Sequence, residues 1–464
     1  MGGTSVAAPE KAIEPVLAPR VIAAAGRGKL LQILGVSFGI AVLIGNTIIV
    51  GILRTPGEVA ARLPSEPLFI GAWVVGGLYA LLGAISLAEP GAMVARSGGQ
   101  YPFVRRGLGE YAGFVVGWSD WISTCAPIAL GGIVFTEYLE PLVPALAGRR
   151  TPAGIVLVVV FGLLLWRGIR IGDLAQQVLS AIKALAFGAL IAAALLLPVP
   201  ALGSVPAALP SGAALATAVV LALQSVIYTY DGWTGPLYFG EEVRNPGRNI
   251  PRSMVLGVLL VILIYVLVNV AFVRVLGIGR MAGDPFVAAS TGKALFGGEG
   301  DTVIRLLVLL AILSGMNACV LMAPRIILAM SRDGLLPAAF DTVNPGGTPS
   351  MAHWTTIGIA AGFIATGTFN TVLALCAFFF VVNYLLSFLS VFALRRKEPH
   401  TPRPWRVPGY PLTTGVAAIG SIAFLIGAAV SDWSNSWKSM VLLALSYPVY
   451  RLVVARRERG GALR

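Results

Sequence analysis

The sequence predicts an all-α polytopic membrane protein, and its composition carries that prediction. Hydrophobic residues make up 57% of the 464 residues, charged residues make up only 12%, and the mean hydropathy is +0.84. Soluble domains contain roughly 25% charged residues, which cover their surface in water. A disordered chain is excluded as well, because disorder combines low hydrophobicity with high charge.

The apolar runs predict about twelve transmembrane helices, because a bilayer span needs roughly 20 mostly apolar residues. The ninth run is short and rich in glycine, which weakens it as a helix. The predicted spans lie near 31–53, 68–93, 110–139, 153–168, 174–198, 213–239, 253–277, 303–331, 354–369, 371–394, 413–431 and 438–455.

Basic residues gather on one side of these spans. With the N-terminus inside, the cytoplasmic segments hold 24 of the 34 Lys and Arg residues and the external segments hold nine, while Lys183 lies within a span. This bias predicts that both termini are cytoplasmic in a multi-pass protein of the plasma (inner) membrane. The net charge of +13 therefore reflects loops beside a lipid bilayer, and we expect no nucleic-acid partner. The oligomeric state stays open.

Few residues are suited to metal or disulfide chemistry. Cys125, Cys319 and Cys376 all lie inside apolar runs, where buried thiols are the expected state. Only His353 and His400 could serve as imidazole ligands, so we expect no metal site and no cofactor. The predicted midplane contains no cluster of His, Asp and Glu, which argues against a membrane enzyme.

Two predicted spans are interrupted. In the first, Gly45, Asn46 and Thr47 are poor helix formers within an apolar run. In the sixth, Asp231-Gly232 and Gly235-Pro236 break the helix pattern. The two spans hold matching positions in two five-helix halves, which points to a midplane site whose free N–H and C=O groups suit a zwitterion. The alternative is that these residues only kink ordinary membrane helices.

Charged and aromatic side chains near the breaks are candidates for function. Lys183 lies deep in the fifth span. Such a lysine can act as a fixed charge, as a proton donor or as a structural residue bonded to neighbouring carbonyls. Asp231 could accept from an ammonium group or cap the following half-helix. Tyr228, Tyr230 and Trp233 cluster at the sixth span, where a large aromatic side chain can act as a lid. For Asp120 and Glu89, nearer the cytoplasmic ends, we expect structural pairing.

Five motifs in order give the sequence a family resemblance. They are GNTIIVGILRTPGEVA (45–60), AEPGAMVARSGGQY (88–101), IYTYDGWTGPLYFGEEVRNPGRNIPRSM (227–254), AMSRDGLLP (329–337) and RRKEPHTPRPWRVPGYP (395–411). On these motifs the chain resembles the amino acid permeases of the amino acid–polyamine–organocation superfamily, most closely the L-amino-acid-transporter branch. The resemblance covers residues 35 to 411.

The resemblance implies a LeuT-type 5+5 inverted repeat with broken helices 1 and 6. The chain then divides into a cytoplasmic tail (1–28), a first repeat of helices 1–5 (29–200), a second repeat of helices 6–10 (210–396), helices 11–12 (397–455) and a cytoplasmic tail (456–464). The substrate would bind between helices 1, 3, 6 and 8 and cross by alternating access.

The resemblance also implies the roles of individual residues. In the family, a turn in helix 1 offers backbone N–H groups to the substrate carboxylate, and Ile49, Val50 and Gly51 stand there in this chain. Ile49 replaces a glycine of the family, which narrows the cavity floor. Tyr228 takes the position of the gating aromatic. The full set of expected substrate-binding residues is Thr47, Ile49, Val50, Gly51, Tyr228, Tyr230, Asp231 and Gly232.

The resemblance also implies that Lys183 takes part in coupling transport to an ion or to exchange, with Ser314 as its partner. In sodium-independent relatives a lysine at this position of helix 5 stands where others bind sodium. The leading hypothesis is therefore a sodium-independent transporter of amino acids or related amines, with proton coupling and exchange both open. A non-transporting membrane sensor or receptor on the same fold is the alternative, motivated by Ile49. A channel is disfavoured because no filter repeat is present.

Overall fold

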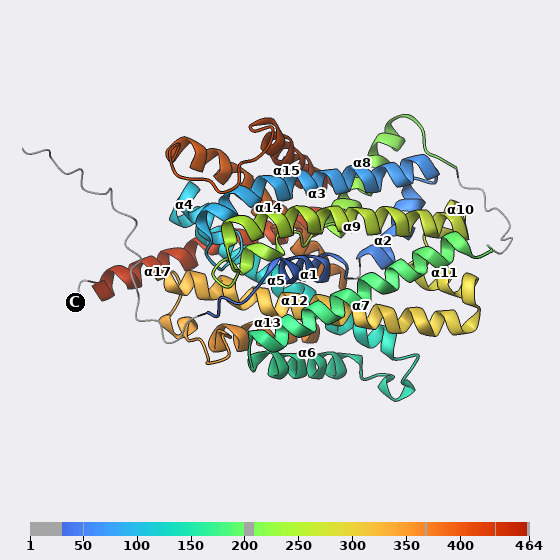
Figure 1. The fold of residues 1–464 in the computed structure, drawn as a ribbon, viewed down its shortest axis with the longest axis horizontal. Helices are drawn as coiled ribbons and strands as arrows, with labels where there is room; N and C mark the ends of the chain where they lie inside the picture. Colours follow the sequence, from blue (N-terminus) through green and yellow to red (C-terminus); the bar gives the residue numbers. More distant parts are fainter. Residues whose placement is uncertain (1–29, 50, 199–207, 367–368, 432, 462–464) are drawn as a thin grey trace, which may run out of the picture.

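The computed structural model describes residues 30–49, 51–198, 208–366, 369–431 and 433–461. Most helices lie side by side along the long axis of the molecule, which gives an elongated bundle (Figure 1). Three isolated β-bridges are the only β-type pairing within the described ranges. The α-helices are α1 (Val36–Thr47), α2 (Gly51–Arg62), α3 (Glu66–Val94), α4 (Tyr101–Leu108), α5 (Glu110–Leu139), α6 (Arg150–Trp166), α7 (Ile169–Leu196), α8 (Gly212–Thr229), α9 (Pro246–Leu276), α10 (Ile278–Met281), α11 (Val287–Phe296), α12 (Gly298–Arg332), α13 (Ser350–Thr366), α14 (Phe369–Lys397), α15 (Leu412–Ser431), α16 (Trp433–Ala444) and α17 (Ser446–Gly461), with short 3-10 helices η1 (Pro144–Leu146), η2 (Gly235–Tyr238) and η3 (Ala338–Asp341).

The bundle confirms the prediction of a multi-pass helical membrane protein. Nine helices of the described chain are long and apolar enough to cross a bilayer, and the bent pair α1 and α2 brings the number to ten. Both α6 and α13 have 17 residues, at the lower limit of roughly 17–25 residues for a span. The count of twelve spans stays a prediction.

Helix ends follow local sequence signals. Helix α9 begins after Asn245, which takes the left-handed conformation at φ 48°, with Pro246 as its first residue. Proline suits this position because its missing N–H would be unpaired there. The helix ends at Leu276 and is followed by Gly277, which has φ 72°. Similarly, α3 starts with Glu66-Pro67, where the acid favours the positive end of the helix dipole.

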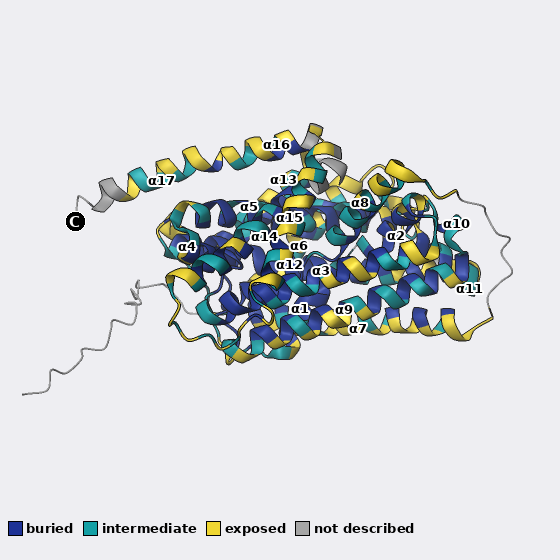
Figure 2. Ribbon diagram, turned by 90° about the horizontal axis from the view of Figure 1, so that it is seen from above, coloured by how far each residue is buried: buried dark blue, intermediate teal, exposed yellow. Residues whose placement is uncertain are grey.

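Helix packing buries the centre of the bundle and leaves an apolar exterior. The inner faces are buried and the outer faces of helices such as α3, α7 and α9 are exposed (Figure 2). Leu185 on α7 and Leu78 on α3 are 73% and 51% exposed, as expected of side chains that face lipid. The largest helix contacts join α3 to α9 and α5 to α12. Helix α1 contacts α7, α9 and α12, so it lies in the middle of the bundle.

The first span is broken as predicted. Helix α1 ends at Thr47, α2 begins at Gly51, and the two helices are bent by 46°. Val50 lies outside the described residues. Because the chain leaves the helix here, the carbonyl groups of the last turn of α1 lose their helical partners.

The sixth span differs from the prediction. Helix α8 ends at Thr229, but the expected second half-helix is replaced by turns and the single 3-10 helix η2. Backbone pairing with other segments accounts for the difference. The Gly98 N–H donates to the Tyr238 carbonyl at 3.2 Å, and the Leu34 N–H donates to the Glu242 carbonyl at 2.9 Å. Bonds to distant segments thus satisfy groups that a helix would pair internally.

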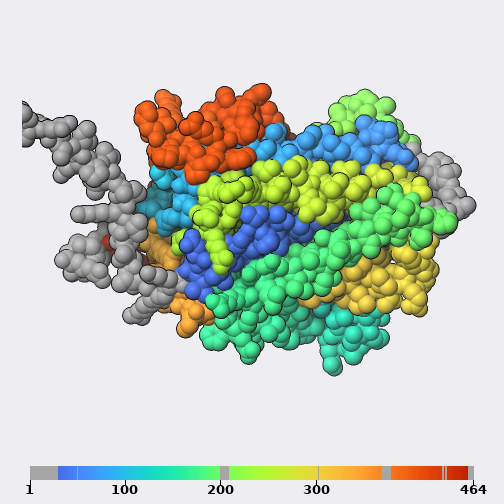
Figure 3. Space-filling model, in the orientation of Figure 1, coloured from blue at the N-terminus to red at the C-terminus, as the bar shows by residue number. Residues whose placement is uncertain are grey.

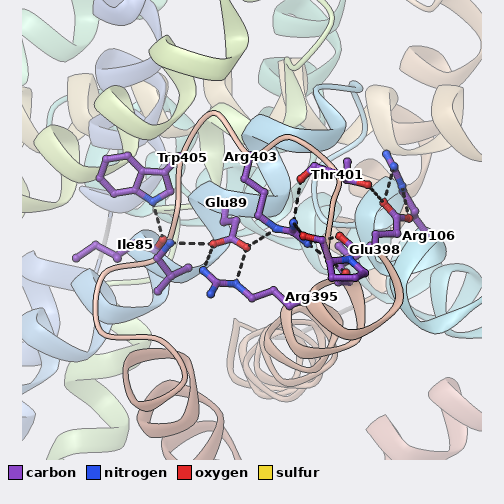
Figure 4. A network of polar contacts seen from close by, with 11 residues as sticks. Ile85, Glu89, Arg106, Arg395, Glu398, Thr401, Arg403 and Trp405 are labelled. Atoms are coloured by element: carbon purple, nitrogen blue, oxygen red, sulfur yellow. Dashed lines mark hydrogen bonds and ion pairs between the residues drawn. The ribbon is translucent and has the colours of Figure 1, made fainter. Parts of the chain in front are cut away.

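One end of the bundle, which carries α4 and the loop 398–411, is held by ion pairs (Figure 4). Glu89 of α3 binds Arg395 at 2.5 Å and Arg403 at 3.1 Å, and accepts the Val407 N–H at 2.8 Å. The loop is thereby tied to α3, so the expected structural pairing of Glu89 is confirmed. At the edge of this network Arg106 hydrogen-bonds Glu398 and lowers the pKa of that carboxyl below its usual value.

Candidate functional site

The two chain breaks lie against each other in the middle of the bundle. The Asn46 side chain donates to the Gly232 carbonyl at 3.1 Å. Gly232 has φ 113°, and a Cβ atom there would lie 2.8 Å from the Thr47 backbone nitrogen. Only glycine therefore permits this approach. The breaks form one shared site, rather than two separate kinks.

A buried tyrosine joins the carbonyl ends of both broken helices. The Tyr265 hydroxyl of α9 lies 2.9 Å from the Thr47 carbonyl oxygen and 3.1 Å from the Thr229 carbonyl oxygen. The side chain is fully buried, and its ring lies 4.8 Å from that of Tyr230. Since a membrane interior has no water to satisfy these carbonyls, one hydroxyl shared between them stabilises both breaks.

Lys183 binds carbonyl groups that the first break leaves without helical partners. Its ammonium group donates to the Ile48 carbonyl at 2.5 Å and to the Gly45 carbonyl at 3.3 Å. The side chain is 2% exposed, and no carboxylate of the described chain pairs with it. The carbonyl end of a helix carries partial negative charge, which favours a cation. Lys183 thus donates hydrogen bonds to the carbonyl end of α1.

Neighbouring polar side chains hold the rest of α1. Gln176 and Ser180 of α7 donate to the Ala41 carbonyl at 3.0 and 2.8 Å. Ser314 of α12 lies 3.3 Å from the Ser180 hydroxyl and 3.5 Å from the Gln176 amide. Among the described residues, Ser314 thus joins α12 to Gln176 and Ser180 of α7, while Lys183 bonds to backbone carbonyls. The coupling role of Ser314 stays a prediction.

Asp231 lies at the end of α8 and contacts α14. The Tyr384 hydroxyl donates to its carboxylate, and the Tyr384 ring stacks on Trp233 with centroids 4.8 Å apart. The expected cap of a half-helix is absent, since η2 begins at Gly235 with Thr234 as its N-cap residue. Asp231 remains half-buried, so the acceptor role stays available to it.

The floor of the first break is tightly packed. The Ile49 side chain is half-buried, and a Cβ atom on Gly315 of α12 would lie 2.5 Å from its Cγ1 atom. A Cβ atom on Gly51 would likewise lie 2.9 Å from Thr229. Glycine at 315 thus leaves the space that Ile49 fills. The Thr47 hydroxyl is buried and has no partner among the described atoms.

The two predicted tyrosines at the end of α8 differ in their surroundings. Tyr228 lies in the last turn of α8 and is half-buried. Tyr230 is 1% exposed and packs against Trp73 and Tyr265 in the hydrophobic core. Tyr228 is therefore the better placed of the two for a gating role, which stays a prediction.

The sequence analysis did not identify Asn46, Tyr265, Tyr384 and Gln176 as site residues. The rule that polar side chains within a span mark function could have identified Tyr265, which interrupts an apolar stretch of α9. Asp120 is fully buried and accepts the Tyr238 hydroxyl at 2.8 Å, in line with its expected structural role. No group of three His, Cys, Asp or Glu side chains within the described part of the chain could hold a metal ion.

A multi-pass helical bundle with a polar site between broken helices is the architecture of a membrane transport protein. The model of the amino acid permease family matches residues 30–447, and the chain belongs to that family.

Named relatives match along nearly the whole chain. The serine/threonine exchanger SteT of Bacillus subtilis is 27% identical over 423 residues, which cover 90% of this chain and 95% of that protein. The b(0,+)-type amino acid transporter 1 of Mus musculus is 26% identical over 446 residues, with 93% and 89% covered. The Asc-type amino acid transporter 1 of Homo sapiens is 25% identical over 449 residues, with 94% and 85% covered. All three names describe transport proteins rather than enzymes.

Proposed function

We propose that this protein is a sodium-independent secondary transporter of amino acids or related amines that works by alternating access. Membership of the amino acid permease family supports the substrate class, and the relatives named above are amino acid transporters or exchangers. Sodium independence is supported by Lys183, whose ammonium group donates hydrogen bonds to the Ile48 and Gly45 carbonyls. In transporters with broken helices, freed carbonyls of this kind coordinate the coupling ion. In this protein the Lys183 ammonium, which is part of the chain, would take the place of that coupling ion.

The helix contacts support a LeuT-type 5+5 inverted repeat. If α1 with α2 is helix 1 and α8 is helix 6, then α3 and α9 are helices 2 and 7, and α5 and α12 are helices 3 and 8. Several helix contacts in one half then have counterparts in the other. The contact of α1 with α9 corresponds to that of α8 with α3, and the contact of α5 with α6 corresponds to that of α12 with α13. The contact of α5 with α14 corresponds to that of α12 with α7. A two-fold relation between 29–200 and 210–396 accounts for all of these couples.

The substrate would bind at the shared site. Its carboxylate would meet the N-terminus of α2, which begins at Gly51, because free N–H groups at a helix N-terminus attract anions. Its ammonium group would meet carbonyls at the end of α8 or the carboxylate of Asp231. Ile49 and Gly51 form the floor, and Tyr228 would cover the site as a gate.

The loop charges support a location in the plasma (inner) membrane with cytoplasmic termini. The end of the bundle with α4, η3 and the loop 398–411 would then face the cytoplasm. The dense arginine network at that end agrees with this orientation.

Flux through purified protein tests the proposed function. The full chain would be reconstituted into liposomes in sodium-free buffer and offered labelled amino acids and amines, with empty or preloaded vesicles and with or without an inward proton gradient. Uptake only into preloaded vesicles identifies an exchanger. Accumulation driven by the proton gradient identifies a symporter. No flux of any compound in either arrangement would contradict the proposal.

A further inference from the structure

Most arginines near the α4 end of the bundle are paired with carboxylates, and two at the start of α9 are not. The paired arginines are Arg96, Arg105, Arg106, Arg325, Arg332, Arg395 and Arg403. Arg248 and Arg252 lie in the first two turns of α9 and are exposed. Neither forms an ion pair with any carboxylate that the structure describes. Their charge is therefore not compensated within the described protein.

Both arginines line one cavity at the start of α9. The cavity has a volume of about 410 Å³ and lies between the first turns of α9 and the loop that contains Trp405. The Trp405 indole donates to the Ile85 carbonyl at 3.2 Å, so this wall is fixed on α3 (Figure 4). Asn245, at the N-terminus of α9, makes no side-chain cap bond to the helix. Two guanidinium groups thus line one space, which suits a phosphate group.

The face of α9 that carries these arginines continues as an apolar stripe. Leu256, Leu259, Leu260 and Leu263 are 51%, 45%, 37% and 54% exposed. Their spacing from Arg252 is that of residues on one side of a helix. Helix α9 lies along the outer surface of the bundle in Figure 3, so the stripe faces the bilayer in a membrane.

We propose that Arg248 and Arg252 bind the phosphate of an anionic phospholipid whose acyl chains lie along this leucine stripe. Arginine binds phosphate oxygens with two N–H groups at once, and the pair would offset the charge of one headgroup. The stripe identifies the source as a lipid rather than free phosphate, because a soluble anion gains nothing from apolar surface beside its site. Tryptophan is enriched in membrane proteins at the level of the headgroups, which is where this proposal places Trp405.

Lipid retention by the purified full chain tests the proposal. Native mass spectrometry from one detergent would measure binding of phosphatidylglycerol, phosphatidylcholine, glycerol phosphate and inorganic phosphate. The variant is Arg248→Gln with Arg252→Gln. The matched control is Arg167→Gln with Arg170→Gln, two exposed arginines beside α6 and α7. A third variant, Arg248→Lys with Arg252→Lys, keeps the charge.

The wild type and the control should retain phosphatidylglycerol in preference to phosphatidylcholine. The glutamine variant should bind phosphatidylglycerol roughly 25-fold more weakly, since each basic group near an anionic surface contributes about fivefold. The lysine variant should recover most of that loss. Equal retention by wild type and glutamine variant would overturn the site. Glycerol phosphate or inorganic phosphate binding as tightly as the lipid would overturn the lipid source.

Discussion

At the scale of single residues, Ile49 and Gly315 divide one small space beside the first break. The family resemblance gives glycine at the position of Ile49, and the structure places a second glycine opposite it. Gly315 therefore leaves room for the side chain of Ile49 at the break. This arrangement was not predictable from the sequence, because the two positions are distant in the chain and meet only through helix packing.

Exchanging the bulk between these positions is testable. Gly315→Ala should lower the uptake rate and destabilise the fold by about 1–3 kcal/mol, because its Cβ atom would lie 2.5 Å from Ile49. Adding Ile49→Ala should restore most of both losses, which a double-mutant cycle of uptake and thermal unfolding would measure. Gly188→Ala on α7 is the control, since nothing lies within 4 Å of its Cβ position. Additive losses in the double variant would contradict the shared space.

At the scale of elements, the site depends on how the two broken helices are joined. Sequence signals located both breaks, because glycine, proline and asparagine act within a turn or two of their own position. The seventh span was predicted to begin near residue 253, whereas α9 begins at Pro246. The extent of the second break was predicted wrongly. There the backbone after Tyr238 pairs with Ser97 and Leu34, and such distant partners leave no local signal. Lys183 was predicted as a site residue, but its carbonyl partners came only from the structure.

Tyr265 gives a test of the joint between the breaks. Tyr265→Phe removes the hydroxyl shared by the Thr47 and Thr229 carbonyls and leaves both buried groups without that donor. Thermal unfolding in detergent should show a loss of about 1–3 kcal/mol, and uptake should fall. Tyr447→Phe serves as the control because that side chain is 51% exposed. Equal stability of the two variants would show that the hydroxyl does not hold the breaks together.

At the scale of the whole molecule, one buried ion pair closes the α4 end of the bundle. Arg325 of α12 meets Glu242, in the segment after η2, at 2.5 and 2.7 Å, and its guanidinium lies 4.6 Å from the Phe239 ring. Both side chains are almost completely buried. Since Glu242 also accepts the Leu34 N–H through its carbonyl, the pair joins the chain before α1 to α12.

Removal of one partner should be costly. Glu242→Gln leaves a buried guanidinium uncompensated, and we expect a loss of about 3–5 kcal/mol in thermal unfolding. Arg106→Gln breaks the partly exposed pair with Glu398 and should cost at most about 1 kcal/mol. Combining Glu242→Gln with Arg325→Gln should recover stability relative to the single variant. A loss for Glu242→Gln no larger than that for Arg106→Gln would refute the role of this pair.

We propose that the Lys183 ammonium takes the place of a coupling sodium ion at the end of α1. Its most direct test is uptake into proteoliposomes as sodium is titrated against choline, with wild type, Lys183→Ala and the control Lys293→Ala, which changes an exposed lysine of α11. Wild type and control should transport equally well at every sodium concentration. Lys183→Ala should remain folded and lose transport. Stimulation of the wild type by sodium, or unchanged uptake by Lys183→Ala, would contradict the claim.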